Sequence, residues 1–150
     1  MERLRNSVPN ENPLLSFIML VKDAERWNRF VVHRLREMEK LAKVSPFPFE
    51  AIFVVNGSVP SDVREQINRL PFAATVVLHG ENHIPRARNI AAREARGTHL
   101  FVWDDDDALR TPEALPAFVQ AYEQLPVGVL CAELLRHDGS HFHPQVPELM

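Results

Sequence analysis

Four consecutive aspartates, Asp104 to Asp107, directly follow the apolar run 98–103. Ligands of open α/β sheets collect at the carboxyl ends of strands, so this position favours a ligand-binding role. If the backbone stays extended, Asp104 and Asp106 point to one side and their carboxylates converge. Neighbouring carboxylates oppose one another's ionisation, and a hard cation such as Mg²⁺ or Mn²⁺ relieves that cost with oxygen ligands. The alternative is a solvated turn that ends the strand.

A basic segment precedes this strand and suits the same chemistry. Mg²⁺ usually shares its site with substrate phosphates, so the aspartates point to a diphosphate ligand. With only five glycines, the chain contains neither G-x-x-x-x-G-K-[ST] nor G-x-G-x-x-G. The remaining device for binding phosphate is the start of a predicted helix, where Arg86, Arg88 and free backbone N–H groups meet an anion. The alternative is a solvated basic face that pairs with Glu94, but the acidic and basic segments support each other.

Apolar runs and helical periodicity alternate along the chain and must position these residues. Strands are predicted over 15–21, 49–56, 74–79, 98–103 and 127–135. Helices are predicted over 25–43, from Ser61 onward, over 84–96 with Gly97 past its end, and over 112–125. Short connections between alternating strands and helices predict an α/β fold with a mainly parallel sheet and helices on both faces. We expect one domain over 1–150, with an N-terminal arm over 1–13 and an irregular tail over 137–150.

Composition narrows the class of protein. Apolar residues make up 45% of the chain and charged residues 25%, the balance of a folded soluble protein. A net charge of -3 gives no basic field for nucleic acid, so we expect no nucleic-acid partner. No apolar stretch reaches the roughly 18 residues of a membrane span. The start of the chain lacks the apolar core of a signal peptide. The single cysteine, Cys131, suits a reducing compartment, and we predict a cytoplasmic protein.

The ordered series LSFIMLVKDAER, FVVNGS and ENHIPRARNIAAREARGTHLFVWDDDDAL resembles the nucleotide-sugar-binding half of glycosyltransferase family 2. The resemblance covers Leu15 to Val129, and its most specific part is ARN, ARG, then an apolar strand that runs into a D-x-D. It implies the Rossmann-like glycosyltransferase A fold, a nucleotide-diphosphate sugar as donor, and Mn²⁺ or Mg²⁺ as cofactor.

The resemblance also assigns roles to particular residues. Asp104 lies near the ribose or the metal, and Asp106 is the direct metal ligand. Arg88 and Asn89 match the family's R-N pair. Asn56 stands where the family usually has an aspartate that grips the base, and His83-Ile84 replaces the glycine usual before the R-N helix. The residues expected to bind the donor are Lys22, Asp23, Asn56, Ser58, Arg88, Asn89 and Asp104.

The family's acceptor half and general base lie beyond the D-x-D, whereas this chain stops at Met150. We therefore expect either a short transferase or a truncated fold that supplies the donor-binding half of a longer one, and we assign no catalytic base. A sheet built to pack against a second half leaves apolar surface uncovered, so we expect a homo-oligomer or a missing acceptor-binding half. One alternative function is a non-catalytic nucleotide-binding or interaction module with the same fold. Nucleotidyl transfer ranks last, because it usually needs a glycine-rich loop after the first strand.

Overall fold

The computed structural model describes residues 1–109, 111–129, 136 and 138–140. The chain divides into two compact units, Met1–Pro116 and Ala117–Met150. The first unit contains the sheet and the residues that the sequence singles out for chemistry. Within the described part of the chain, no helix has both the length and the apolar composition that a bilayer crossing requires.

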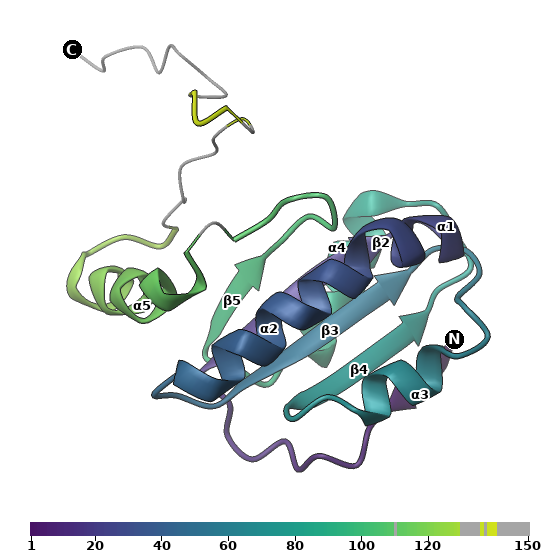
Figure 1. Cartoon of the computed structure of the whole chain (residues 1–150), viewed down its shortest axis with the longest axis horizontal. Helices are drawn as coiled ribbons and strands as arrows, with labels where there is room; N and C mark the ends of the chain where they lie inside the picture. The colour runs from purple at the N-terminus through teal and green to yellow at the C-terminus, as the bar shows by residue number, and fades with distance from the viewer. Residues whose placement is uncertain (110, 130–135, 137, 141–150) are drawn as a thin grey trace. The chain divides into compact units, whose positions relative to one another are not determined.

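The sheet of the first unit has five strands in the order β1-β4-β3-β2-β5. Their bounds are Glu2–Arg5 for β1, Leu15–Val21 for β2, Phe49–Val55 for β3, Ala73–Leu78 for β4 and His99–Val102 for β5. Strands β2 to β5 are parallel and β1 runs antiparallel to β4 (Figure 1). The predicted α/β class with a mainly parallel sheet is confirmed. Because the chain steps from β2 outward to β4 and then returns to the other side of β2, the strand order reverses between β2 and β5.

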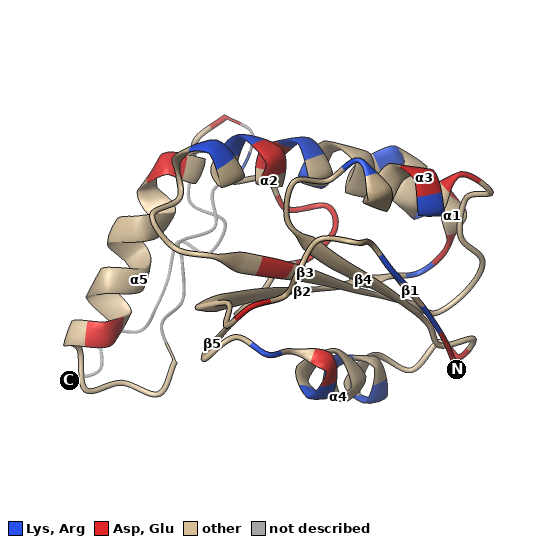
Figure 2. Cartoon of the chain, turned by 90° about the horizontal axis from the view of Figure 1, so that it is seen from below, with Lys and Arg blue, Asp and Glu red and all other residues tan. Residues whose placement is uncertain are grey.

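Helices cover both faces of this sheet, as predicted. A continuous helical segment follows β2 and consists of α1 (Ala24–Arg26), the π-helical turn η1 (Trp27–Val31) and α2 (Val32–Val44). It lies with α3 (Val63–Asn68) on one face, and α4 (Ile84–Glu94) lies on the other (Figure 2). The N-cap position of α3 is Asp62 rather than the predicted Ser61. The 3₁₀ turn η2 (Pro112–Ala114) leads into α5 (Leu115–Gln124).

Both faces of the central strands are buried. Every residue of β3 is buried, and so is all of β2 except Leu20, which explains why both strands read as continuous apolar runs rather than as alternating ones. On the α4 face the core consists of Ile18, Ile52, Val54, Val77, Ala87, Ile90 and Ala91. On the other face Trp27 is fully buried, stacks near Phe53 and donates its indole N–H to Gln66 Oε1 at 2.8 Å.

Strand β1 was not predicted. It lies within the segment interpreted as an arm, and its residues are exposed except Leu4, so the sequence offers one apolar position instead of a pattern. Strand β1 forms by pairing with the edge of β4, a contact that the local sequence does not indicate. The predicted strand over 127–135 is not tested as a whole, since residues 130–135 lie outside the described residues and 127–129 are not in a strand. Of the predicted tail over 137–150, only 138–140 are described.

A buried polar network fixes the chain just before β5. The carboxylate of Glu50, 2% exposed, accepts hydrogen bonds at 2.6 Å from Ser16 Oγ and from the backbone N–H of Arg96. The N–H of Gly97 donates to Ser16 Oγ at 2.8 Å, and a Cβ at Gly97 would lie 2.5 Å from that oxygen. Gly97 is therefore required by close packing against β2, which the interpretation as a helix-end glycine did not foresee.

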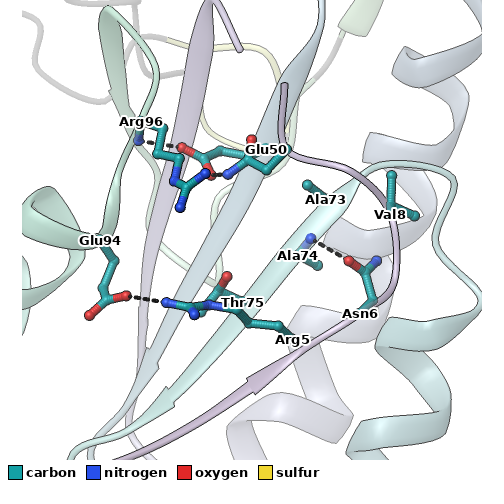
Figure 3. Close-up of a pocket in the computed structure, with 10 residues that line it drawn as sticks. Arg5, Asn6, Val8, Glu50, Ala73, Ala74, Thr75, Glu94 and Arg96 are labelled. Atoms are coloured by element: carbon teal, nitrogen blue, oxygen red, sulfur yellow. Dashed lines mark hydrogen bonds and ion pairs between the residues drawn. The ribbon is translucent and has the colours of Figure 1, made fainter. Parts of the chain in front are cut away.

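The same network borders a pocket of about 180 Å³ at the amino ends of β3 and β4 (Figure 3). Arg5 reaches into it from β1 and Arg96 from the loop between α4 and β5, and Arg5 donates to Glu94 at 3.1 Å. The buried carboxylate of Glu50 also accepts from Asn10, so protein donors already satisfy both of its oxygens. The polar groups that line this pocket are thus accounted for by contacts within the fold. The pocket lies at the opposite end of the sheet from the aspartates.

Candidate functional site

The four aspartates form a turn after β5. The backbone N–H of Asp107 donates to the carbonyl of Asp104 at 3.1 Å, so the extended backbone on which the convergence of Asp104 and Asp106 was argued is not present. Their exposure nevertheless alternates. The side chains of Asp104 and Asp106 are 59% and 52% exposed, whereas that of Asp105 is 6% exposed. Two carboxylates therefore face solvent together, and the one between them serves another purpose.

Asp105 is paired with Arg26, the last residue of α1. The guanidinium donates through Nε to Asp105 Oδ2 at 2.8 Å and through Nη2 to Oδ1. These hydrogen bonds raise the pKa of Arg26 above its usual range, against the opposing effect of burial. Nη2 also lies 3.2 Å from Asp106 Oδ2. A buried carboxylate needs such a partner, because desolvation without one is costly.

The far end of the turn is held by α2 and by the last residue of the apolar run. The carbonyl of Asp107 accepts from the indole N–H of Trp103 at 2.7 Å and from Nη1 of Arg34. The pKa of the Asp107 carboxyl is raised, first by burial and then by the charges of Asp104 and Asp106. Two arginines of the helical segment after β2, together with Trp103, thus hold the acidic turn in place and partly offset its four like charges.

The loops after β2 and β3 lie against each other. Asp23 caps α1 by accepting the N–H of Arg26 at 3.0 Å, so it orients the residue that holds Asp105. A Cβ at Gly57 would lie 2.8 Å from the carbonyl oxygen of Lys22, so only glycine allows this approach. The side chain of Lys22 is exposed, as is Ser58.

Two polar atoms at the ends of β3 and β4 are buried without a hydrogen-bond partner among the described residues. They are Oδ1 of Asn56, a residue that is 7% exposed, and Nε2 of His79, whose side chain is 5% exposed and lies 3.9 Å from Oε2 of Glu81. Nε of Arg34, beside the acidic turn, is a third such atom. Asn56 and His79 follow Val55 and Leu78, which are opposite each other in the parallel pair, so their side chains project from the same face. Buried polar atoms are rarely left unsatisfied, and a bound ligand is one explanation for such atoms. Nothing in the local sequence singles out His79.

The start of α4 offers fewer free donors than predicted. Pro85 lies in its first turn as expected, but the N-cap His83 accepts the N–H of Arg86 through Nδ1 at 3.2 Å. The guanidinium of Arg86 is engaged by Glu81 at 2.7 Å. Arg88, two residues further along, is half-exposed and reaches Asp104 Oδ1 at 3.7 Å. Arg88, rather than the helix terminus, is therefore the group available to an anion.

The acidic turn offers part of the set of ligands that a divalent ion requires. Among the described residues, no group of three or more His, Cys, Asp or Glu side chains is placed to hold a metal ion. Asp104 and Asp106 offer half-exposed carboxylate oxygens, and Mg²⁺ commonly takes one or two carboxylates and fills its remaining positions with water and phosphate. The residues fit an ion shared with a diphosphate and do not fit an ion held by protein alone.

The structure brings some of the predicted residues together and leaves others apart. Asp104 meets Arg88, and the backbone of Lys22 and Asp23 meets Gly57. Ser58 and Asn89 are exposed and, among the described residues, join none of these contacts. Sequence reasoning missed Arg26 and Arg34, because basic residues in an amphipathic helix resemble a solvated face. Only the packing of that helix beside β5 shows their role.

Comparison with known proteins agrees with this architecture. The family model described as Glycosyl transferase family 2 matches residues 16–149. The mixed α/β fold with its mostly parallel five-stranded sheet is consistent with the Rossmann-like glycosyltransferase A fold. Searches of curated proteins and of solved structures gave no match.

Proposed function

The chain belongs to glycosyltransferase family 2, and from this premise we propose that it binds a nucleotide-diphosphate sugar at the carboxyl edge of its sheet. The bound sugar is then transferred to an acceptor hydroxyl. The donor lies where the strand order reverses between β2 and β5, the usual ligand position in open α/β sheets. The loops after β2 and β3 border the nucleoside, and the acidic turn and α4 border the diphosphate.

The observation that carries this proposal is the meeting of Arg88 and Asp104. Arg88 comes from α4 and Asp104 from the turn after β5, and Nη2 lies 3.7 Å from Oδ1 while both side chains remain half-exposed. A cation and an anion that meet without burial keep hydrogen-bonding capacity for a ligand. Arg88 binds and orients the diphosphate, and its charge-assisted hydrogen bonds strengthen as negative charge develops on the departing group.

The proposal includes a divalent ion, Mn²⁺ or Mg²⁺, for which Asp104 and Asp106 would be the protein ligands. When bound, it would neutralise charge on the diphosphate leaving group. Asp106 would hold the ion directly, and Asp104 would lie near the ribose or the ion. The half-exposure of both carboxylates supports this role, because an ion or water can reach each of them although an arginine lies beside one oxygen of each.

The unpartnered atoms of Asn56 and His79 suit the nucleobase. Oδ1 of Asn56 accepts, so it requires an N–H on the ligand. Uracil, thymine and guanine each present a ring N–H beside a carbonyl, and we assign that edge to Asn56 Oδ1, with His79 Nε2 as donor to the carbonyl. Asn56 brings no charge to this edge.

Calorimetry with UDP, GDP and dTDP, each with and without Mn²⁺, tests the donor site. We expect binding that requires Mn²⁺ and that is lost in Asp106→Ala. Binding without the metal, or binding unchanged in Asp106→Ala, contradicts the assigned ligand. Sugar transfer is measured separately with the matching nucleotide sugars. If the chain binds the nucleotide sugar but neither transfers nor hydrolyses it, the result favours the non-catalytic module.

A matched pair of variants tests the role of α4. Arg88→Ala should weaken nucleoside diphosphate binding by about 1.5–3 kcal/mol, roughly one to two decades in affinity. Arg93 is an exposed arginine in the last turn of the same helix, so Arg93→Ala removes the same charge and controls for helix stability. Equal and small effects of both variants on affinity, at low and high salt, would remove α4 from the site.

A further inference from the structure

The contacts of Arg26 extend beyond one salt bridge. Its guanidinium holds both oxygens of Asp105, and the side chains of Arg26 and Asp105 are 34% and 6% exposed. The same guanidinium stacks on the ring of Phe30, 4.6 Å from the ring centroid, which fixes its plane. The backbone N–H of Arg26 is held by Asp23. Three residues thus determine where this positive charge lies.

A further contact has no structural need. Nη2 of Arg26 lies 3.2 Å from Oδ2 of Asp106, although Asp106 is half-exposed and solvated. The pair between Arg26 and Asp105 already meets the requirement that a buried carboxylate have a partner. The contact with Asp106 places the guanidinium beside a carboxylate that the proposed function gives to a divalent ion.

We propose that Arg26 is the positioning residue of the acidic turn and its internal counter-cation. Through Asp105 it anchors the turn, and through Nη2 it neutralises Asp106 until a divalent ion competes for that carboxylate. Asp105 is then an anchor and contributes no metal ligand. This inference rests on the proposed function for the identity of Asp106 as a ligand, and it adds the residue that sets the affinity for the ion.

The physical reason is competition for one carboxylate. An ion that binds Asp106 must displace or share the Nη2 contact, and it also meets repulsion from the guanidinium charge. Because the pair is half-exposed, this opposition is modest, and it weakens divalent-ion binding by about two- to fivefold, the range for one surface ion pair. The benefit is weaker repulsion among the carboxylates of the turn in the absence of the ion.

The decisive variant is the double change Arg26→Gln with Asp105→Asn. It removes both members of the buried pair together, keeps hydrogen-bonding groups of similar shape, leaves the net charge unchanged and leaves Asp106 without its arginine. The matched control is Arg29→Gln. Arg29 stacks on the same Phe30 ring, 5.0 Å from the centroid, and among the described residues it forms no ion pair with a carboxylate. It therefore reports the effect of losing a nearby positive charge.

Mn²⁺ binding is measured by the electron paramagnetic resonance signal of free Mn²⁺, without nucleotide and with UDP, and thermal unfolding is followed in the same samples. We expect the double variant to bind Mn²⁺ about two- to fivefold more tightly than wild type. Arg29→Gln should bind it nearly as wild type does. Arg26→Lys keeps the charge but not the planar fork that reaches two carboxylates, so it should also bind Mn²⁺ more tightly and serves if the double variant does not fold.

Three outcomes overturn the inference. Unchanged Mn²⁺ affinity in the folded double variant, or in Arg26→Lys, would leave Arg26 as a structural ion pair only. Weaker Mn²⁺ binding in the double variant at unchanged melting temperature would make Asp105 a ligand instead of an anchor. If wild type binds no Mn²⁺ with or without UDP, the metal part of the proposed function fails and this inference fails with it, which separates the two cases.

Discussion

Replacing Gly97 by alanine tests the packing that places β5 and the acidic turn. The new Cβ would lie 2.5 Å from Ser16 Oγ, 2.7 Å from Ser16 N and 2.9 Å from the carbonyl carbon of Leu15. Two of these are backbone atoms of the buried strand β2, which cannot move aside cheaply. Overpacking of this kind costs about 1–3 kcal/mol. Weakening the hydrogen bond from Gly97 N–H to Ser16 Oγ, now 2.8 Å, adds about 0.5–1.5 kcal/mol.

We therefore expect Gly97→Ala to lower the free energy of unfolding by about 2–4 kcal/mol and the melting temperature by roughly 5–15 °C. Urea titration followed by circular dichroism measures the loss. Gly128→Ala is the control, because no atom lies within 4 Å of its added Cβ, and it should change stability by less than about 0.5 kcal/mol. Adding Ser16→Ala to Gly97→Ala should not recover the loss, since the backbone contacts remain and the buried carboxylate of Glu50 loses a hydrogen bond. A Gly97→Ala protein as stable as wild type would refute this reasoning.

Two further changes test the groups around the site. Burial raises the pKa of Glu37 against the opposing charge of Arg34, so the folded chain holds this proton more tightly than the unfolded chain and stability falls as pH rises past about 4.3. Glu37→Gln should remove that fall. If the melting temperatures of the two proteins change in parallel between about pH 4 and pH 7, this prediction is contradicted. In Gly57→Ala the new Cβ would lie 2.8 Å from the Lys22 carbonyl oxygen. This change should cost more free energy of UDP binding than free energy of unfolding. Calorimetry that shows unchanged UDP affinity would argue against a nucleoside contact from that loop.

Local sequence was sufficient for the elements that carry strong patterns. The runs over β2 and β3 are buried on both faces, so nearly every position is apolar and the strands can be read directly. The helix that became α4 was readable from its proline and its periodicity. Strand β1 was not readable, because one buried leucine among charged residues is no pattern and its partner lies far along the chain.

The role of Gly97 could not be predicted for a similar reason. A glycine past the end of a helix is common, and nothing near it in sequence shows that Ser16 lies against it. The same holds for Glu50, a carboxylate inside an apolar strand whose hydrogen-bond donors come from Ser16, Arg96 and Asn10. Contacts between residues so distant in sequence leave no periodic signal.

The sequence by itself determined the α/β class, the strand that leads into the aspartates and the candidacy of Asp104, Asp106 and Arg88, because these depend on residue type and on order along the chain. Only the tertiary structure decided what each aspartate does. The backbone turns at Asp104, Asp105 is buried against Arg26, and Asp106 is left half-exposed. Four identical residues cannot be told apart by type. Their burial and their partners distinguish them. Folding sets both, because it places the helical segment with Arg26 and Arg34 beside the turn after β5.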